Sequence, residues 1–169
     1  MSTVEQMTKS DGYQERGVGK PRRYSKTTKG GRILKYGVSA VVGDGKGYIG
    51  FGKRSAREVA VAMPKALDRA RRDMLYVQLH EGTIYHRVEA TYSATKVVIL
   101  PAKNTGIIAG GPMRAIFEVI GIKHIVSKII GSRNPTNVVR ATLKALEKVT
   151  TPEAMKEKRR SRLNHNGDK

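Results

Sequence analysis

The chain has 169 residues, of which 33 are Lys or Arg and 14 are Asp or Glu, so its formal net charge is +19. Because such a charge repels itself in a compact fold unless a polyanion neutralises it, nucleic acid is the expected partner. The absence of cysteine excludes disulfides and cysteine-ligated zinc. No export signal is recognisable, and no apolar run approaches the roughly 18 residues of a membrane helix. We therefore expect a cytoplasmic protein without a membrane association.

The N-terminal region becomes increasingly basic along the chain. Residues 1–20 are polar with few apolar anchors, and they are expected to form a mobile arm. The sequence contains no acidic residue between Arg16 and Gly43. Basic residues accumulate there: Arg16, Lys20, Arg22, Arg23, Lys26, Lys29, Arg32 and Lys35. Although a run of charge is usually a solvated face, Gly30 and Gly31 permit a bend or a close approach, which favours contact with a polyanion.

A hairpin and a helix are predicted next. Strands over 33–42 and 47–53 flank the segment Gly43–Gly47, whose glycines can adopt the positive φ of a hairpin turn. Ser55 and Glu58 have the spacing of a capping box, which predicts a helix from there to about residue 75. Pro64 should kink this helix.

The predicted helix has two different faces. Its buried stripe follows the helical period, and its members are Val59, Met63, Ala66, Ala70 and Met74. Lys65, Arg69 and Arg72 lie on the opposite face and form a cationic ridge. A hairpin packed on one basic helix suits recognition of RNA by its shape and phosphates, although Lys and Arg are also ordinary helix formers.

The second half alternates strands and helices. Strands are predicted over 84–92, 96–100 and 124–130. One helix begins at Pro112 and stops at Gly121, and another is capped by Asn134, begins at Pro135 and ends before Pro152. The expected fold class is therefore α+β, with two small domains at 21–78 and 79–150, an arm at 1–20, and a solvated basic tail at 151–169.

Other motifs give no positive indication of catalysis. The segment Gly106–Gly111 precedes a helix, as phosphate loops do, but it matches neither common phosphate-loop pattern. Its apolar Ile107 and Ile108 favour docking on another protein. The segment Lys46–Phe51 only partly fits an RRM signature. The histidines lack metal-ligand spacing, so no metal, cofactor or reaction is predicted.

Six separated segments, in one order across about residues 20–150, resemble the family of the bacterial small-subunit ribosomal protein number five. They are Ser25–Arg32, Val41–Gly45, Gly50–Lys53, Ala56–Val59, Thr105–Gly111 and Asn134–Thr142. The resemblance implies an N-terminal domain similar to double-stranded-RNA-binding folds without their first helix. It also implies a C-terminal β-α-β-α domain.

The resemblance further implies a ribosome-bound position near the junction of head and body. Expected partners are small-subunit ribosomal RNA, small-subunit ribosomal proteins four and eight, and messenger RNA at the channel through which it enters. In the family, the segment matching Ser25–Arg32 reaches toward RNA of the head and is linked to the response to spectinomycin. The segment matching Thr105–Gly111 faces protein four, and that interface influences decoding accuracy.

The residues that we expect to bind RNA are Arg22, Arg23, Ser25, Lys26, Lys29, Gly30, Gly31, Arg32, Lys53, Arg54, Arg57, Lys65, Arg69 and Arg72. Those expected at a protein interface are Thr105, Gly106, Ile107, Ile108, Gly110 and Gly111. Two other hypotheses remain open from the sequence. One is a free regulator that binds double-stranded RNA outside the ribosome. The other is a small-molecule kinase that uses Gly106–Gly111.

Overall fold

A computed structural model of the chain describes the backbone of residues 12–166 and the side chains of residues 12–160. Its first half is an antiparallel sheet with one helix. The elements, in chain order, are β1 (Gln14–Gly17), β2 (Arg22–Thr28), β3 (Gly31–Gly43), β4 (Tyr48–Ala56), α1 (Val59–Arg72) and β5 (Met74–Tyr76). Strand β3 pairs with β4 along one edge and with β1 and β2 in succession along the other.

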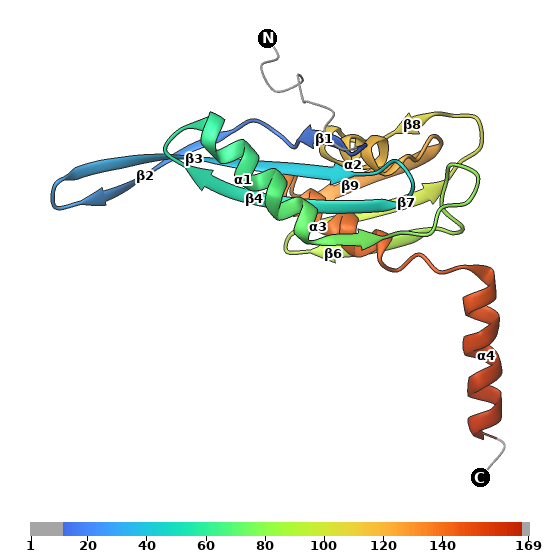
Figure 1. The fold of residues 1–169 in the computed structure, drawn as a ribbon. Helices are drawn as coiled ribbons and strands as arrows, with labels where there is room; N and C mark the ends of the chain where they lie inside the picture. Colours follow the sequence, from blue (N-terminus) through green and yellow to red (C-terminus); the bar gives the residue numbers. More distant parts are fainter. Residues whose placement is uncertain (1–11, 167–169) are drawn as a thin grey trace.

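Strand β3 is long, and one part of it is buried in the body while the other part is exposed to solvent. Its C-terminal part, Val38–Gly43, is largely buried, whereas Gly31–Lys35 is exposed. The exposed part pairs with β2 to form a ribbon that projects from the body, as the blue hairpin at the left of Figure 1 shows. We call β2, the turn and residues 31–37 of β3 the projecting hairpin.

Helix α1 lies directly on β4 because both contact surfaces consist of small residues. Ala62, Ala66 and Ala70 are the fully buried side chains of the helix. A Cβ added at Gly52 would lie 1.8 Å from the carbonyl oxygen of Ala66, and one at Gly50 would lie 1.9 Å from that of Ala70. The absence of side chains at Gly50 and Gly52 thus allows the helix axis to approach the sheet closely.

The predicted start of α1 is wrong. Ser55 lies within β4, opposite Gly37, and the N-cap is Glu58, whose side chain makes no capping hydrogen bond. The strand continues through the proposed capping box because its pairing with β3 extends to Ala56. The helix also ends at Arg72, and Met74 begins a short strand. Pro64 lies inside the helix.

The second half is a four-stranded sheet covered on one face by two helices. Its elements are β6 (Val88–Tyr92), β7 (Thr95–Pro101), β8 (Ile107–Ile108), α2 (Gly111–Ile120), β9 (Ile125–Gly131) and α3 (Pro135–Leu146). The strand order is β6-β7-β9-β8, with β8 parallel to β9. The predicted α+β class is confirmed, and the β8-α2-β9-α3 segment has the expected β-α-β-α order.

The predicted caps of this half are confirmed. Gly121 ends α2 in the left-handed conformation, with φ of 93°. The Asn134 side chain accepts a hydrogen bond from the Thr136 backbone N–H at 3.4 Å. Helix α3 ends at Leu146, earlier than predicted.

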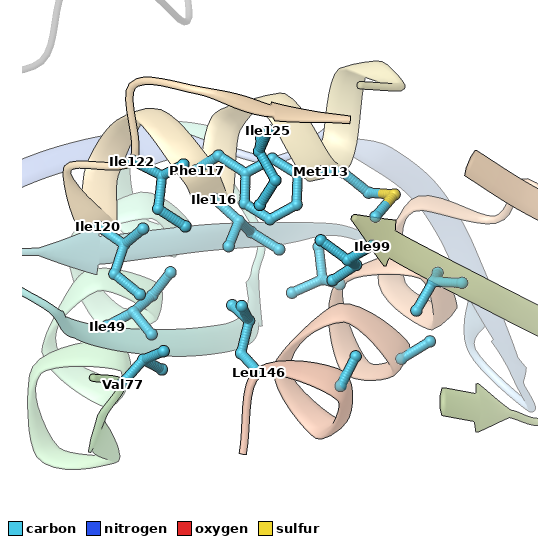
Figure 2. Close-up of a cluster of buried hydrophobic side chains, with 14 of the residues drawn as sticks. Ile49, Val77, Ile99, Met113, Ile116, Phe117, Ile120, Ile122, Ile125 and Leu146 are labelled. Carbon is cyan, nitrogen blue, oxygen red and sulfur yellow. The ribbon is translucent and has the colours of Figure 1, made fainter. Parts of the chain in front are cut away.

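One hydrophobic core joins the two halves. Ile49 and Val77 from the first half lie beside Ile120 and Leu146 from the second, and Figure 2 shows their side chains converging. The turn between β3 and β4 docks on the end of α2, because the Gly45 N–H donates to the Val119 carbonyl at 3.1 Å and the Gly47 N–H donates to the Ile120 carbonyl at 3.2 Å. The halves are therefore fixed relative to each other.

The N-terminal segment differs in part from the expected arm, and the C-terminal segment is helical. Within the arm predicted over residues 1–20, Gln14–Gly17 forms β1 and Val18 is buried, because the alternating pattern there adds an edge strand to β3. Residues 1–11 lie outside the described residues. The expected tail contains helix α4 (Pro152–Asn166), which projects from the body in Figure 1. No helix in the described part of the chain is long and apolar enough to cross a bilayer.

Candidate RNA interface

The projecting hairpin presents its cationic side chains to solvent. Those of Arg22, Arg23, Lys26, Lys29, Arg32 and Lys35 are all exposed. None of them forms an ion pair with a carboxylate among the residues that the structure describes. Since the sequence from Arg16 to Gly43 has no acidic residue, no neighbouring charge within the hairpin offsets this field. The hairpin is therefore a cationic projection suited to a polyanion.

The structure changes the conformation expected for this segment. The sequence analysis predicted no strand before residue 33, but Arg22, Arg23, Ser25 and Lys26 lie in β2, in register with residues 33–37 of β3. Only Lys29 and Gly30 form the turn. Strand pairing fixes the spacing of the side chains, so the candidate RNA contacts stand on a ribbon rather than on a mobile loop.

The backbone at the tip is open. A Cβ added at Gly30 or Gly31 would have no atom within 4 Å, and Gly31 has φ of 122°, a conformation that L side chains rarely adopt. The Thr28 hydroxyl donates to the Gly31 carbonyl at 3.0 Å and closes the turn. The tip thus offers bare peptide groups to a partner, as the pair of glycines predicts.

Helix α1 carries a second group of cations on its outward face. Lys65, Arg69 and Arg72 are exposed, as the sequence predicts, whereas the buried residues of the helix are Ala62, Ala66 and Ala70. Arg69 pairs with Asp73 at 2.5 Å, which partly neutralises it. Lys53, Arg54 and Arg57 are also exposed, near the β4–α1 connection. Arg71 forms an ion pair with Glu15, which ties the helix to β1.

Four hairpin residues of interest were missing from the predicted site. Lys35 lies opposite Tyr24 in the ribbon. Tyr24, Ile33 and Leu34 are large apolar side chains that are 47%, 40% and 48% exposed. Ile33, Leu34 and Lys35 lie within the strand predicted over 33–42. Their exposure was not predicted, because the sequence analysis did not predict the partner strand over 22–28 with which they form a ribbon.

The predicted protein interface divides between core and surface. Ile107 packs against the core, because it lies opposite Ile125 on the inner face of the sheet. Ile108 points to the other face and is 52% exposed. The segment Thr105–Gly111 is anchored to the start of β9 by the Gly106 N–H, which donates to His124 Nδ1 at 3.2 Å. Of the two isoleucines, Ile108 is therefore the one available to a partner.

Ile108 belongs to an apolar surface on the outer face of the second sheet. Leu100 and Ile130 lie on this face as well and are 38% and 51% exposed, while α2 and α3 cover the inner face. Toward β6 the face becomes polar. The hydrogen bond and charge of Lys96, which lies 3.0 Å from Glu89, hold the pKa of that carboxyl below its usual range.

Gly111 is the first residue of α2, and Gly110 precedes it. Gly110 is the N-cap, and a Cβ added there would lie 2.7 Å from Ile129 Cδ1, so the loop packs closely on β9. Thr105 and Gly111 are exposed. No group of three or more His, Asp and Glu side chains within the described residues is arranged to hold a metal ion.

Comparison with known proteins gives one consistent result. Two domain models, described as Ribosomal protein S5, N-terminal domain, and Ribosomal protein S5, C-terminal domain, match residues 18–78 and 90–159. The small ribosomal subunit protein uS5 of Legionella pneumophila (strain Corby) is 49% identical over 158 residues, which are 93% of this chain and 94% of that protein. That of Cupriavidus pinatubonensis (strain JMP 134 / LMG 1197) is 51% identical over 157 residues, 92% of this chain and 91% of that protein. The first domain match contains the projecting hairpin and α1, the second contains residues 105–111, and the chain belongs to the ribosomal protein S5 family.

Proposed function

We propose that this chain is a structural constituent of the small ribosomal subunit, bound to the ribosome in the cytoplasm and without reaction chemistry of its own. The observation that carries the proposal is the projecting hairpin, whose exposed cations have no ionic partner in the described chain. Family membership supports it, since the relatives are named as small-subunit proteins. Ribosomal RNA is the polyanion that these cations bind.

Two separate groups of cations bind RNA. The hairpin extends its cations away from the body, whereas Lys65, Arg69 and Arg72 of α1 stand on the rigid first half. Salt-sensitive contacts of Lys and Arg with phosphates position a protein without reading bases. Such a protein stabilises the arrangement of RNA segments, here the geometry of head and body.

Protein neighbours are proposed for the second half. The exposed Ile108, with Leu100 on the same face and Val126 between them, suits an apolar protein contact. By family resemblance, the neighbours are small-subunit proteins four and eight. The second half of the chain is joined rigidly to the RNA-binding half through the shared core. A protein contact on the second half would therefore transmit strain to the RNA that the first half binds. That is the proposed basis for effects on translational accuracy and on the channel where messenger RNA enters.

Sedimentation of a lysate separates this proposal from a free RNA regulator and from a kinase. Nearly all of a tagged chain should co-sediment with the small subunit, because its charge favours permanent neutralisation by RNA. A large share in lighter soluble fractions would instead favour the regulator. Heat evolved on titration with Mg-ATP would favour the kinase.

Replacing Gly30 by aspartate should weaken RNA binding by roughly tenfold, because it places a carboxylate at the tip of a cationic hairpin. Folding should not change, since a Cβ at Gly30 meets no atom within 4 Å. Subunits carrying this variant should show altered misreading and translocation. Gly30→Ala, which adds the Cβ without the charge, is the matched control. Unchanged misreading and translocation with Gly30→Asp would contradict the proposed role.

A further inference from the structure

Helix α4 extends from the body as a polar arm. Its residues 155–160 are all exposed, and Figure 1 shows the helix leaving the end of the body opposite the projecting hairpin. Between residues 152 and 160, Met155 is the only large apolar residue, so this part of α4 has no apolar stripe that could pack on a protein. Because a short helix is marginal in water without tertiary packing, we expect a partner to cover α4.

The start of α4 is anchored to the second half of the chain. The hydroxyl oxygen of Thr151 accepts a hydrogen bond from the Ala154 N–H at 3.2 Å. Just before it, the Thr150 N–H donates to His86 Nε2 at 3.2 Å. Because Nε2 accepts, Nδ1 of the neutral ring carries the hydrogen and donates to the Arg87 carbonyl, 2.9 Å away. His86 thus holds the segment from which α4 leaves the body.

The charged residues of α4 separate into two sides. Residues three or four apart in a helix share a side. Lys158 and Arg159 therefore stand on the same side as Met155, and we call this the Arg159 side. Glu153 and Glu157 are four residues apart, and the helical turn of about 100° per residue places them opposite Met155. The Arg159 side is therefore cationic, and both carboxylates of residues 152–160 lie on the other side.

The cations of α4 need a counter-charge from outside the chain. Arg159 and Arg160 form no ion pair with a carboxylate among the side chains that the structure describes. The sequence over 158–167 contains three consecutive cations and Arg162, but no acidic residue. Like charges crowded on a helix destabilise it unless an anion neutralises them. Phosphates meet this need, whereas a protein contact would require apolar surface that residues 152–160 do not offer.

We propose that α4 is an RNA-binding arm, whose Arg159 side contacts phosphates of ribosomal RNA and whose direction is set by His86. This deepens the proposed function and rests on it. The chain then contacts RNA at both of its ends, through the projecting hairpin at one end and through α4 at the other. The segment that the sequence predicts to be a solvated tail is therefore a binding element.

Removing the cations of the Arg159 side tests the contact with phosphates. In the full chain, Lys158→Gln with Arg159→Gln should lower the affinity for small-subunit ribosomal RNA by about tenfold in low salt, and should make the salt dependence shallower by about two units of slope. Since glutamine is also a good helix former, circular dichroism should show the same helix content. Lys103→Gln with Lys123→Gln removes two exposed cations elsewhere in the second half and is the matched control. An unchanged slope with the first pair, or an equal change with both pairs, would overturn the proposal.

Cysteine labels on the two sides of α4 test which side contacts RNA. The chain has no cysteine, so Met155→Cys and Glu157→Cys each provide a single attachment point for a short photo-crosslinker. In assembled small subunits, the label at position 155 should crosslink to ribosomal RNA, and the label at position 157 should do so several-fold less. Crosslinking of the first label mainly to a ribosomal protein, or equal crosslinking of both labels to RNA, would contradict the arrangement.

His86→Leu tests whether His86 positions the arm. This variant removes the acceptor for the Thr150 N–H, so the label at position 155 should crosslink to a wider set of nucleotides. His86→Gln, whose side-chain oxygen can accept the same hydrogen bond, should restore the original set. If His86→Leu leaves the crosslinked nucleotides unchanged, His86 does not set the direction of α4. The projecting hairpin is intact in all of these variants, so a chain that fails to enter the small subunit would contradict the proposed function instead.

Discussion

Replacing Gly52 by valine is expected to lower the free energy of unfolding by more than about 3 kcal/mol, beyond the usual cost of overpacking. A Cβ at this position would lie 1.8 Å from the Ala66 carbonyl oxygen and 2.8 Å from the Ala70 backbone nitrogen. These are backbone atoms, so no side-chain rotation can relieve the clash, and α1 must move away from β4. Urea unfolding followed by circular dichroism would measure the loss.

Gly111→Ala is the control for this variant. A Cβ at Gly111 meets no atom within 4 Å, and the residue begins α2, where alanine is favoured over glycine in a helix. This variant should unfold at the same urea concentration as the parent or slightly higher. A Gly52→Val protein as stable as the parent would show that α1 is not seated on the sheet in the way described.

The packing of α1 on the sheet also fixes the positions of its cations. Lys65 and Arg72 stand on the side of the helix away from Gly52, so a helix lifted from the sheet displaces them relative to the hairpin. The spacing of the two cationic groups is therefore set by a glycine that is buried beneath α1. Sequence alone can assign such a glycine to a strand, but not to a helix contact.

Elements that depend on local backbone preferences were predictable from the sequence, whereas elements that depend on pairing with residues far away in the sequence were not. The hairpin turn at Gly43–Gly47 and the left-handed cap at Gly121 follow from local backbone preferences, and both were predicted. The helix start failed because Ser55 is held in a strand by its pairing with Gly37, a contact that the local pattern does not contain. The strand Gln14–Gly17 was missed for the same reason, since its partner is β3.

For the site, the sequence predicts which residues carry charge but not how they face. The exposure of Lys29, Arg32 and Lys65 agrees with the prediction. The division of the hairpin cations between two faces depends on the register of β2 with β3. The sequence analysis did not predict this register, because it predicted no strand before residue 33. Likewise, only the register of β8 distinguishes the half-buried Ile107 from the exposed Ile108.

Replacing Gly121 by alanine should separate the two halves at their contact. Gly121 has φ of 93°, and a Cβ there would lie 2.1 Å from the Gly45 carbonyl oxygen. The added atom must push the β3–β4 turn away, which strains the bonds from Gly45 to Val119 and from Gly47 to Ile120. We expect a loss of about 3 kcal/mol or more in stability, combining backbone strain with the lost contact.

Gly106→Ala separates the two causes of that loss. Gly106 has φ of 70°, but a Cβ there meets no atom within 4 Å, so its substitution carries the backbone strain without the clash. It should cost about 1–2 kcal/mol. If both variants lose the same stability, the turn does not depend on close docking against α2. If Gly121→Ala loses more and its urea transition also broadens, the halves have been uncoupled, and the hairpin is no longer rigidly connected to the face that carries Ile108.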